Sequence, residues 1–453
     1  MKILYILHKF LPRYFSGTEI YTYSLCREMQ RRGHDVLVFC AEDVDAGPDD
    51  RIRATDDAYD GIPVHRIFFN RRKTPDVVRY SYDNPLVADH CAWFLSLHQP
   101  DVVHATSFIN VSAAVVDAAR AFGCPMLFTA TDYWCFCPKS ILLNHKQELC
   151  TRPDPAECLA CIIELSSLQQ RLLKPAGISA ALTARWCARV SRLPVLRNNP
   201  FLKGAASLEA RPRYLQRQMH TVDLVIAPNA FMYKLFLEFG VASGRVIHSI
   251  YGLNTEGIHP AGNTAANGRI RFAYIGMLGA LKGVELLLRS FRPLAASNRA
   301  SLAVYGDDSH FPRYVRGLKQ IAQDCPSIAF RGTFPPDRLG EVLSEIDVLV
   351  VPSLWYENAP LVIQSAFAAG VPVVGADVPG IAELVTHEAN GLLFVRGNQS
   401  SLAASLQRFI DEPELLPRLR SGICPPKSIA ENGEELEQQY LRLIQNREKE
   451  GKG

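Results

Sequence analysis

Apolar segments and helical patterns alternate along the first 130 residues of the chain. Short apolar runs typical of buried strands occur at residues 3–7, 35–40, 101–104 and 126–129. Between them, residues 18–32 and 111–122 carry apolar side chains at helical spacing. Strand, helix and strand repeated in this order predict a parallel sheet with helices on both faces.

The same alternation returns in the second half of the chain. The predicted strands lie at 270–275, 302–305, 347–351 and 371–374, and the predicted helices at 283–291, 312–323 and 361–369. The pattern predicts an α/β fold with two doubly wound, Rossmann-like domains, which we place at 1–225 and 226–428. A boundary after Gly252 fits the same pattern. A charged amphipathic helix at 429–450 could cross back to the first domain.

Composition narrows the class of protein. Of the 453 residues, 48% are hydrophobic and 21% are charged, which are globular values and exclude a chain that is disordered as a whole. No run approaches the 18 apolar residues of a membrane span, and the apolar start is too short for a signal peptide. We therefore expect a cytoplasmic protein.

One stretch does not fit the alternation: an insert at 135–220. Between residues 165 and 220 ten Lys and Arg face a single acidic residue, Glu209, and Leu and Trp are interleaved with Arg. This pattern is typical of an interfacial helix on anionic lipid, at the inner membrane face, but a solvated helical face packed on the first domain would look the same. No recognised nucleic-acid-binding motif is present, and we expect no nucleic-acid partner.

The insert also begins with a group of cysteines. Cys137, Cys150, Cys158 and Cys161 follow the pattern C-x12-C-x7-C-x2-C, and the last two have the spacing of a thiolate pair on a metal. In a reducing compartment such clustering favours metal over disulfides. We predict a structural zinc site, with an iron–sulfur cluster or buried free thiols as the alternatives.

Two turns between a predicted strand and its helix carry glycine. Gly17 follows the first strand, Gly276 and Met277 follow the strand at 270–275, and Lys282 stands where the next helix begins. Glycine lets backbone approach a ligand closely, and a helix N-terminus offers free N–H groups to an anion. Lys282 beside such an end would hold a diphosphate, although an ordinary turn with a surface lysine fits this segment as well.

The segment at 352–374 is the most informative. A strand ends at Pro352, a polar loop with Glu357 and Asn358 follows, and Pro360 stands near the first helical position. Open α/β sheets bind ligands beyond the carboxyl ends of their strands, which is where this loop lies. Glu357 could accept hydrogen bonds from sugar hydroxyls, or it could be a solvated side chain in a capped loop.

Taken in order along the chain, these motifs resemble those of the retaining glycosyltransferases of family 4, which have the GT-B fold. The resemblance rests on residues 17–19, 32–36, 282–283, 357–374 and 379–385. It implies that Lys282 binds the donor diphosphate, that Glu357 contacts the donor sugar and that Gly17 lies near the phosphates. It further implies that the backbone after Glu357 lies against the donor, at Asn358, Ala359, Pro360 and Leu361.

Three positions depart from the family pattern. Ser365 stands where the family usually has a glutamate for the nucleotide ribose, so this contact is weakened or passes through water. Met277 replaces an arginine beside the diphosphate. Thr131 stands where many members have a histidine, directly before the aspartate that is here Asp132. We expect Thr131, Asp132 and Tyr133 to line the acceptor side of the site. Gly276 and Met277 complete the expected donor-binding residues.

The resemblance implies a hexosyltransferase that moves a sugar from a nucleotide-sugar to a glycan or glycolipid acceptor, in surface polysaccharide synthesis. Lys282, Glu357 and Asp132 are the catalytic candidates, and we expect no catalytic metal because Lys282 and backbone N–H groups can stabilise the departing diphosphate. Two alternatives remain: a GT-B protein that binds a donor or a partner without turnover, and a nucleotide-sugar epimerase of the same fold.

Overall fold

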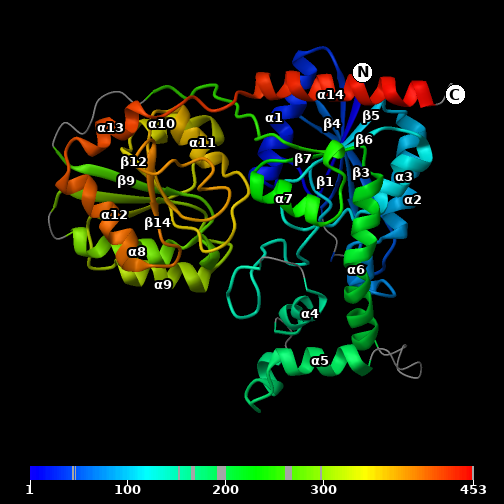
Figure 1. Ribbon diagram of the computed structural model, residues 1–453, viewed down its shortest axis with the longest axis horizontal. Coiled ribbons are helices and arrows are strands. Elements are labelled where there is room, and N and C mark those ends of the chain that lie inside the picture. The colour runs from blue at the N-terminus through cyan, green and yellow to red at the C-terminus, as the bar shows by residue number, and fades with distance from the viewer. Residues whose placement is uncertain are drawn as a thin grey trace. The chain divides into compact units, whose positions relative to one another are not determined.

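The structure is a computed structural model that describes residues 1–450 apart from 43–44, 46, 151–153, 165–168, 191–199, 261–267 and 296–297. The chain divides into two compact units (Figure 1). Unit 1 consists of Met1–Pro228, Met232–Ser249 and Gly433–Gly453, and unit 2 of Asn229–Phe231 and Ile250–Asn432. We describe each unit by itself.

Unit 1 is built on an eight-stranded sheet with the order β3-β4-β2-β1-β5-β6-β7-β8. Its strands are β1 (Lys2–Leu7), β2 (Asp35–Ala41), β3 (Arg53–Tyr59), β4 (Ile62–Phe68), β5 (Val102–Ala105), β6 (Met126–Thr129), β7 (Leu224–Ala227) and β8 (Val246–His248). The β3–β4 pair is antiparallel and the other pairs are parallel. The central strands β5, β6 and β7 are buried at every position, which explains their unbroken apolar sequences.

The helices of unit 1 connect these strands or extend from them. They are α1 (Gly17–Arg31), α2 (Pro85–His98), α3 (Ala114–Phe122), α4 (Pro155–Glu164), α5 (Ala180–Val190), α6 (Pro200–Thr221), most of α7 (Ala230–Glu238) and most of α14 (Ile429–Glu450). The insert forms α4, α5 and α6, and α6 leads directly into β7. Figure 1 shows α5 beyond the end of α6 that lies farthest from the sheet. No helix among the described residues is long and apolar enough to span a membrane.

The division between the units lies later than the boundary at 225/226 and close to the alternative after Gly252. β7 pairs with β6, with Leu224 opposite Leu127, and β8 pairs with β7. The segment from 224 to 248 therefore completes the first sheet, and unit 2 takes over at Ile250. From the sequence alone, the strand–helix–strand pattern of β7, α7 and β8 could end the first sheet or begin the second. The local sequence does not specify which sheet a strand joins.

Unit 2 is built on six parallel strands with the order β11-β10-β9-β12-β13-β14. The strands are β9 (Ile270–Ile275), β10 (Ala300–Tyr305), β11 (Ile328–Gly332), β12 (Val348–Val351), β13 (Val373–Ala376) and β14 (Gly391–Phe394). The helices are α8 (Val284–Ala295), α9 (Pro312–Ala322), α10 (Leu339–Ser344), α11 (Leu361–Ala368), α12 (Gln399–Asp411) and α13 (Leu415–Ser421), and they lie on both faces of the sheet (Figure 1). The predicted α/β class with two parallel sheets is confirmed.

Each sheet has a point where the strand order reverses. In unit 1, β1 lies between β2 and β5, and in unit 2, β9 lies between β10 and β12. Open α/β sheets bind ligands outside the carboxyl ends of the strands at such a point. The loops that follow β1 and β5, and those that follow β9 and β12, are therefore where chemistry is expected.

The C-terminal helix is anchored to unit 1 by buried polar groups. The hydroxyl of Tyr440 lies 3.1 Å from that of Tyr5 and 2.6 Å from Nδ1 of His104, whose Nε2 lies 2.7 Å from the hydroxyl of Thr129. All four side chains are buried, and burial lowers the pKa of His104 to about 3, so its ring is neutral. These buried polar groups have their hydrogen bonds only when Tyr440 lies opposite Tyr5 and His104, and this requirement fixes the position of α14 on the sheet.

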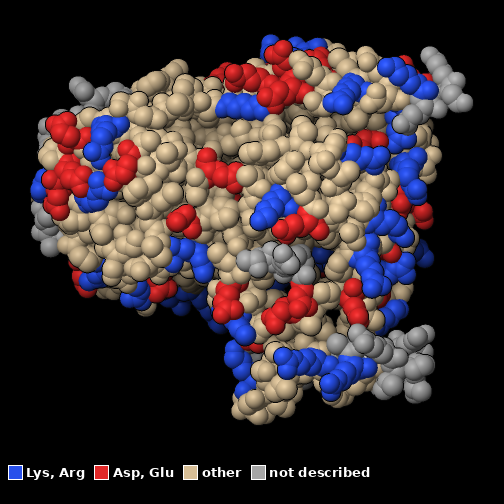
Figure 2. Space-filling model, in the orientation of Figure 1, with Lys and Arg blue, Asp and Glu red and all other residues tan. Residues whose placement is uncertain are grey.

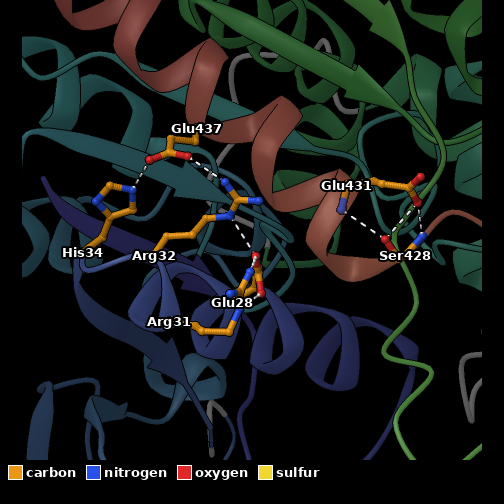
Figure 3. A network of polar contacts seen from close by, with 7 residues as sticks. All are labelled: Glu28, Arg31, Arg32, His34, Ser428, Glu431 and Glu437. Atoms are coloured by element: carbon orange, nitrogen blue, oxygen red, sulfur yellow. Dashed lines mark hydrogen bonds and ion pairs between the residues drawn. The ribbon is translucent and has the colours of Figure 1, made fainter.

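Charged side chains continue this anchor at the surface (Figure 3). Glu437 of α14 accepts a hydrogen bond from Arg32 at 2.9 Å and pairs with His34 at 2.8 Å, and Arg32 also donates to Glu28. At the start of the helix, Ser428 and Glu431 cap one another. The motif at residues 32–36 thus serves, in part, to hold α14.

Candidate functional site

In unit 2 a lysine and a glutamate meet at the switch point of the sheet. Lys282 ends a short turn after β9, and Glu357 lies in the loop after β12; their Nζ and Oε1 atoms are 2.7 Å apart. Oε1 also accepts hydrogen bonds from Oγ of Ser353 at 2.6 Å and from Nε1 of Trp355 at 2.9 Å. The ammonium of Lys282 lies 5.0 Å from the centre of the Trp355 ring, within range of a cation–π contact.

Glu357 is only 8% exposed, yet it is held as a carboxylate. Burial by itself would raise its pKa, but Lys282 and the hydroxyl and indole donors outweigh burial, and the pKa is lowered overall. The result is an ionised pair between a buried carboxylate and a partly exposed ammonium. A buried pair of this kind is costly to desolvate and is weak evidence for a purely stabilising role.

Two glycines let the loops around this pair approach one another. Gly283 has φ +72°, and a Cβ at this position would lie 1.9 Å from the carbonyl oxygen of Pro352. Gly380 has φ +83°, and a Cβ there would lie 2.2 Å from the carbonyl oxygen of Glu357. Any side chain at either position would push away the backbone that carries Glu357, which explains the glycines in both motifs.

The remaining donor candidates lie around the same loops. Tyr274 donates a hydrogen bond to the carbonyl of Met277 at 2.7 Å, which fixes the turn after Gly276, and the side chain of Met277 is exposed. Asn229 donates to the carbonyl of Asn358 at 2.6 Å, and Asn358 donates to the hydroxyl of Tyr251 at 2.7 Å. The backbone after Glu357 is thus held in place by side chains from unit 2 itself.

The loop leads into helix α11. Ala359 is buried, Pro360 is the N-cap and Leu361 is the first helical residue, so the free N–H groups of the helix start just after Glu357. Ser365 is 2% exposed, and its hydroxyl donates to the carbonyl of Leu361 at 2.9 Å. This hydroxyl is engaged by the backbone of its own helix, and the ribose contact stays a prediction.

In unit 1 the loop after β1 begins helix α1 at Gly17. Ser16 and Glu19 form a capping box. The Ser16 hydroxyl accepts a hydrogen bond from the backbone N–H of Glu19, and the Glu19 carboxylate accepts one from the backbone N–H of Ser16. Glu19 is buried and its Oε1 lies 3.1 Å from Nε2 of His8. Burial raises its pKa, but His8 and Ser16 together lower it overall, so the carboxylate is ionised beside the start of the helix.

Three loops of unit 1 are joined at the acceptor-side candidates. Thr18 donates to the hydroxyl of Thr131 at 2.8 Å, and Thr131 donates to the carbonyl of Thr106 at 2.5 Å. Asp132 accepts from Oγ of Ser107 and from the backbone N–H of Trp134, both at 2.7 Å. These contacts join the ends of β1, β5 and β6, so the structure brings Gly17 and its neighbours together with Thr131 and Asp132.

Asp132 and Tyr133 differ in their environment. Burial raises the pKa of Asp132, and the bonds from Ser107 and Trp134 only partly offset this effect. Tyr133 is almost completely buried, so it belongs to the core beneath the loop more than to its surface. Of the two, Asp132 is the side chain that is partly exposed.

Sequence reasoning missed three residues of these loops and one that contacts them from a helix. Ser107 directly follows a predicted strand, and Ser353 and Trp355 lie in the loop already singled out, so their positions could have been proposed by the same argument. Arg211 could not, because it comes from α6, far along the chain. It is buried, donates to the carbonyl of Trp134 and stacks 4.7 Å from the centre of that ring.

The predicted zinc site is not supported by the structure. Cys137, Cys150, Cys158 and Cys161 do line one pocket, but among the described residues no group of three or more His, Cys, Asp or Glu side chains is placed to hold a metal ion. In the metal-free protein, burial raises the pKa of Cys150 to about 11 and that of Cys158 to about 12. The spacing predicted the clustering, but it could not set the distances between sulfur atoms on separate segments.

Two family profiles match the chain and together cover more than half of it. Residues 16–153 match the glycosyl transferase 4-like domain, and residues 269–412 match the glycosyl transferases group 1. The fold, with two α/β units built on sheets of this topology, is the GT-B fold of solved glycosyltransferase structures. The chain belongs to the group 1, family-4-like glycosyltransferases.

Solved structures with the same fold extend over almost the whole chain. HepE of Anabaena, in complex with UDP and glucose, superimposes with a TM-score of 0.62 at 17% identity and covers 97% of this chain and 99% of that one. Sucrose-phosphate synthase of Thermosynechococcus elongatus gives a TM-score of 0.66 at 17% identity, with 98% and 99% covered. At these identities the likeness shows the fold alone.

Sequence relatives match over shorter lengths. An uncharacterised glycosyltransferase of Methanocaldococcus jannaschii is 30% identical over 139 residues, which are 31% of this chain and 35% of that protein. An uncharacterised 42.6 kDa protein in the cps region of Klebsiella pneumoniae is 21% identical over 85% of this chain and 87% of its own length. The first of these matches thus spans about a third of the relative.

Proposed function

We propose that the protein is a retaining hexosyltransferase that uses a nucleotide-sugar and a glycan or lipid-linked acceptor in surface polysaccharide synthesis. The observation that carries the proposal is the Lys282–Glu357 pair at the switch point of the second sheet. Two comparisons support it: HepE was crystallised with UDP-glucose, and the Klebsiella relative lies in a cps region.

In this proposal Lys282 and the first N–H groups of α11 bind the donor diphosphate. The diphosphate competes with Glu357 for the ammonium, and Glu357 then accepts hydrogen bonds from hydroxyls of the donor sugar. Charge that develops on the departing diphosphate is stabilised by groups that are already in place, which is the condition for efficient electrostatic catalysis. Met277 adds no cation at this end.

The acceptor side is assigned to unit 1. Asp132 and Thr131 would face the transferred sugar, and Gly17 at the start of α1 would offer backbone N–H groups to phosphate. A front-face route, in which the leaving phosphate takes the acceptor proton, requires no enzymatic nucleophile and retains the anomeric configuration. Asp132 is then a positioning and electrostatic group.

Donor binding is the first test. We would measure thermal shifts and calorimetric affinities for UDP-, GDP- and ADP-sugars with the wild type, Lys282→Ala and Glu357→Gln. A ligand at about 100 times its Kd adds about 2.7 kcal/mol to the stability of the wild type. The matched control is Lys234→Ala, an exposed lysine of α7 whose Nζ lies 4.0 Å from Glu238.

The outcomes separate the three candidate activities. A sugar nucleotide that stabilises the wild type and the control, but not Lys282→Ala, supports the proposed donor site. Turnover with an acceptor and retained configuration by NMR supports the transferase. A new sugar nucleotide formed without acceptor would identify an epimerase, and tight donor binding without any turnover would favour a binding or partner role.

A further inference from the structure

Helix α5 turns only one face toward the rest of the insert. Helices α4, α5 and α6 share a small apolar core of their own, to which α5 contributes Ala180, Ala184 and Cys187. These three positions lie four and three residues apart, so they form a single stripe on the helix. Among the described residues, the side chains on the opposite stripe of α5 do not belong to this core.

That opposite stripe carries large apolar side chains. Leu182 is 58% exposed and Trp186 is 61% exposed, and their spacing of four places them side by side on the helix. Leu172 and Ile178, in the segment that leads into α5, are exposed as well. Four of the fourteen large apolar side chains that are exposed in the described part of the chain thus lie within fifteen residues.

The same surface is basic. Residues 171–190 contain Arg171, Lys174, Arg185 and Arg189 and no Asp or Glu, and all four basic side chains are exposed. Arg185 and Arg189 flank Trp186 along the helix. Figure 2 shows Lys and Arg gathered along α5. Lys174 is paired with Glu164 at 2.8 Å, so the local excess of charge rests on the three arginines.

A second helix of unit 1 shows that exposed apolar side chains alone do not make such a surface. On α2, Trp93 is 50% exposed and Leu97 is 60% exposed, at the same spacing of four. Helix α2 contains no Lys or Arg, and Asp89 stands one turn before Trp93. The two helices therefore offer the same apolar pair with opposite local charge.

We propose that the face of α5 formed by Leu182, Arg185, Trp186 and Arg189 docks the protein on an anionic phospholipid surface. A tryptophan ring beside leucine is suited to the boundary between headgroups and acyl chains, and arginines beside it meet the phosphate groups. The charge complementarity selects anionic lipid as the occupant, and the convex face of one helix needs no shaped partner. This inference is independent of the proposed donor site.

Vesicle co-sedimentation tests the proposal on the full chain. Vesicles would contain phosphatidylcholine alone, or phosphatidylcholine with about a third phosphatidylglycerol, at low and high salt. The charge variant is Arg185→Glu/Arg189→Glu. Its matched control is Arg213→Glu/Arg217→Glu on α6, two exposed arginines of the same basic stretch and spacing, beside the buried Leu215 and Met219.

The apolar variant is Leu182→Ser/Trp186→Ser, and its matched control is Trp93→Ser/Leu97→Ser on α2. Circular dichroism and melting curves verify that each variant is folded. We expect the wild type to bind only the anionic vesicles, both α5 variants to lose at least tenfold in partitioning, and both controls to stay within about twofold.

Three results would overturn the proposal. They are a wild type that ignores anionic vesicles, controls that lose as much binding as the α5 variants, and a Leu182→Ser/Trp186→Ser variant that binds like the wild type. The last result would mean that charge alone drives binding and that the helical face has no part in it. None of these measurements uses a sugar nucleotide, so failure of the donor site would not affect them.

Discussion

Asp132 in unit 1 and Glu357 in unit 2 are held in similar ways, but their pKa values shift in opposite directions. Each carboxylate follows a parallel strand near a switch point and accepts one hydrogen bond from a serine hydroxyl. Each also accepts one from a tryptophan, through the backbone N–H of Trp134 for Asp132 and through the indole N–H of Trp355 for Glu357. Only Glu357 has a lysine at hydrogen-bond distance. Burial therefore raises the pKa of Asp132, while Lys282 reverses the effect of burial on Glu357.

The comparison indicates that a cation in direct contact lowers the pKa of a buried carboxylate more than neutral donors do. It also exceeds the effect of His8 and Arg211, whose charges lower the pKa of Asp132 but do not offset its burial. Under the proposed function, Lys282 passes from Glu357 to a diphosphate, and this exchange requires the cation close to the carboxylate. Asp132 would face only neutral hydroxyls, for which a contacting cation is not required. The predictions below test this division of roles.

The largest effect is expected from Lys282→Met. Loss of the cation removes stabilisation of the departing diphosphate, and kcat/KM should fall by about 100- to 1,000-fold. The variant also leaves Glu357 without its cation, and unfolding should cost about 2 kcal/mol less, below the range for fully buried pairs because Lys282 is partly exposed. Steady-state kinetics and urea unfolding measure the two effects.

A double variant refines this prediction. Lys282→Met/Glu357→Gln should recover part of the stability that Lys282→Met loses, because no buried charge remains, but none of the activity. If Lys282→Met alone stays within threefold of the wild type in kcat/KM, the difference between the two carboxylates is not catalytic.

Gly283→Ala is expected to come next. Its Cβ would meet the carbonyl of Pro352, and its φ is positive, so we expect a loss of about 3 kcal/mol and of donor binding. Gly370→Ala is the matched control, since Gly370 has φ +69° but nothing within 4 Å of a Cβ, and it should cost about 1 kcal/mol. Equal losses in thermal melts would show that the close approach of the loops is unimportant.

The pH dependence of stability should separate the two carboxylates by sign. Because the folded pKa of Asp132 is raised, its ionised form destabilises the fold, and Asp132→Asn should melt above the wild type at pH 7. This advantage disappears below the unfolded pKa of about 4. Because the folded pKa of Glu357 is lowered, Glu357→Gln should melt below the wild type at pH 7, and its deficit shrinks as pH falls below about 4.3.

Melting curves between pH 3 and pH 8 measure both differences. Shifts of the same sign for the two variants at pH 7 would contradict the assigned charge states.

The smallest effect is expected from Ser365→Ala. The hydroxyl bonds the carbonyl of Leu361 in its own helix, so its removal should change donor affinity by less than threefold. Ser353→Ala removes a hydrogen bond to ionised Glu357, and here donor affinity should fall about tenfold. A tenfold loss in Ser365→Ala by calorimetry would show that the serine contacts the nucleotide directly.

The sequence by itself determined the two α/β layers, because buried parallel strands require unbroken apolar runs and helices between them. It also predicted the loops that carry Lys282, Glu357 and Asp132, since the carboxyl ends of parallel strands are where open sheets bind ligands. The family followed from the order of these loops. Local patterns were sufficient for all of this.

Only the tertiary structure decided which edge β7 and β8 join and that the four cysteines line one pocket without a metal-binding group among the described residues. It also decided that Lys282 meets Glu357, while no described lysine lies at hydrogen-bond distance from Asp132. It also decided which face of α5 is covered. Each of these depends on distances between segments that are remote along the chain, and such distances are set by packing. A sequence pattern specifies what a side chain can do, but its partners determine its charge and its exposure.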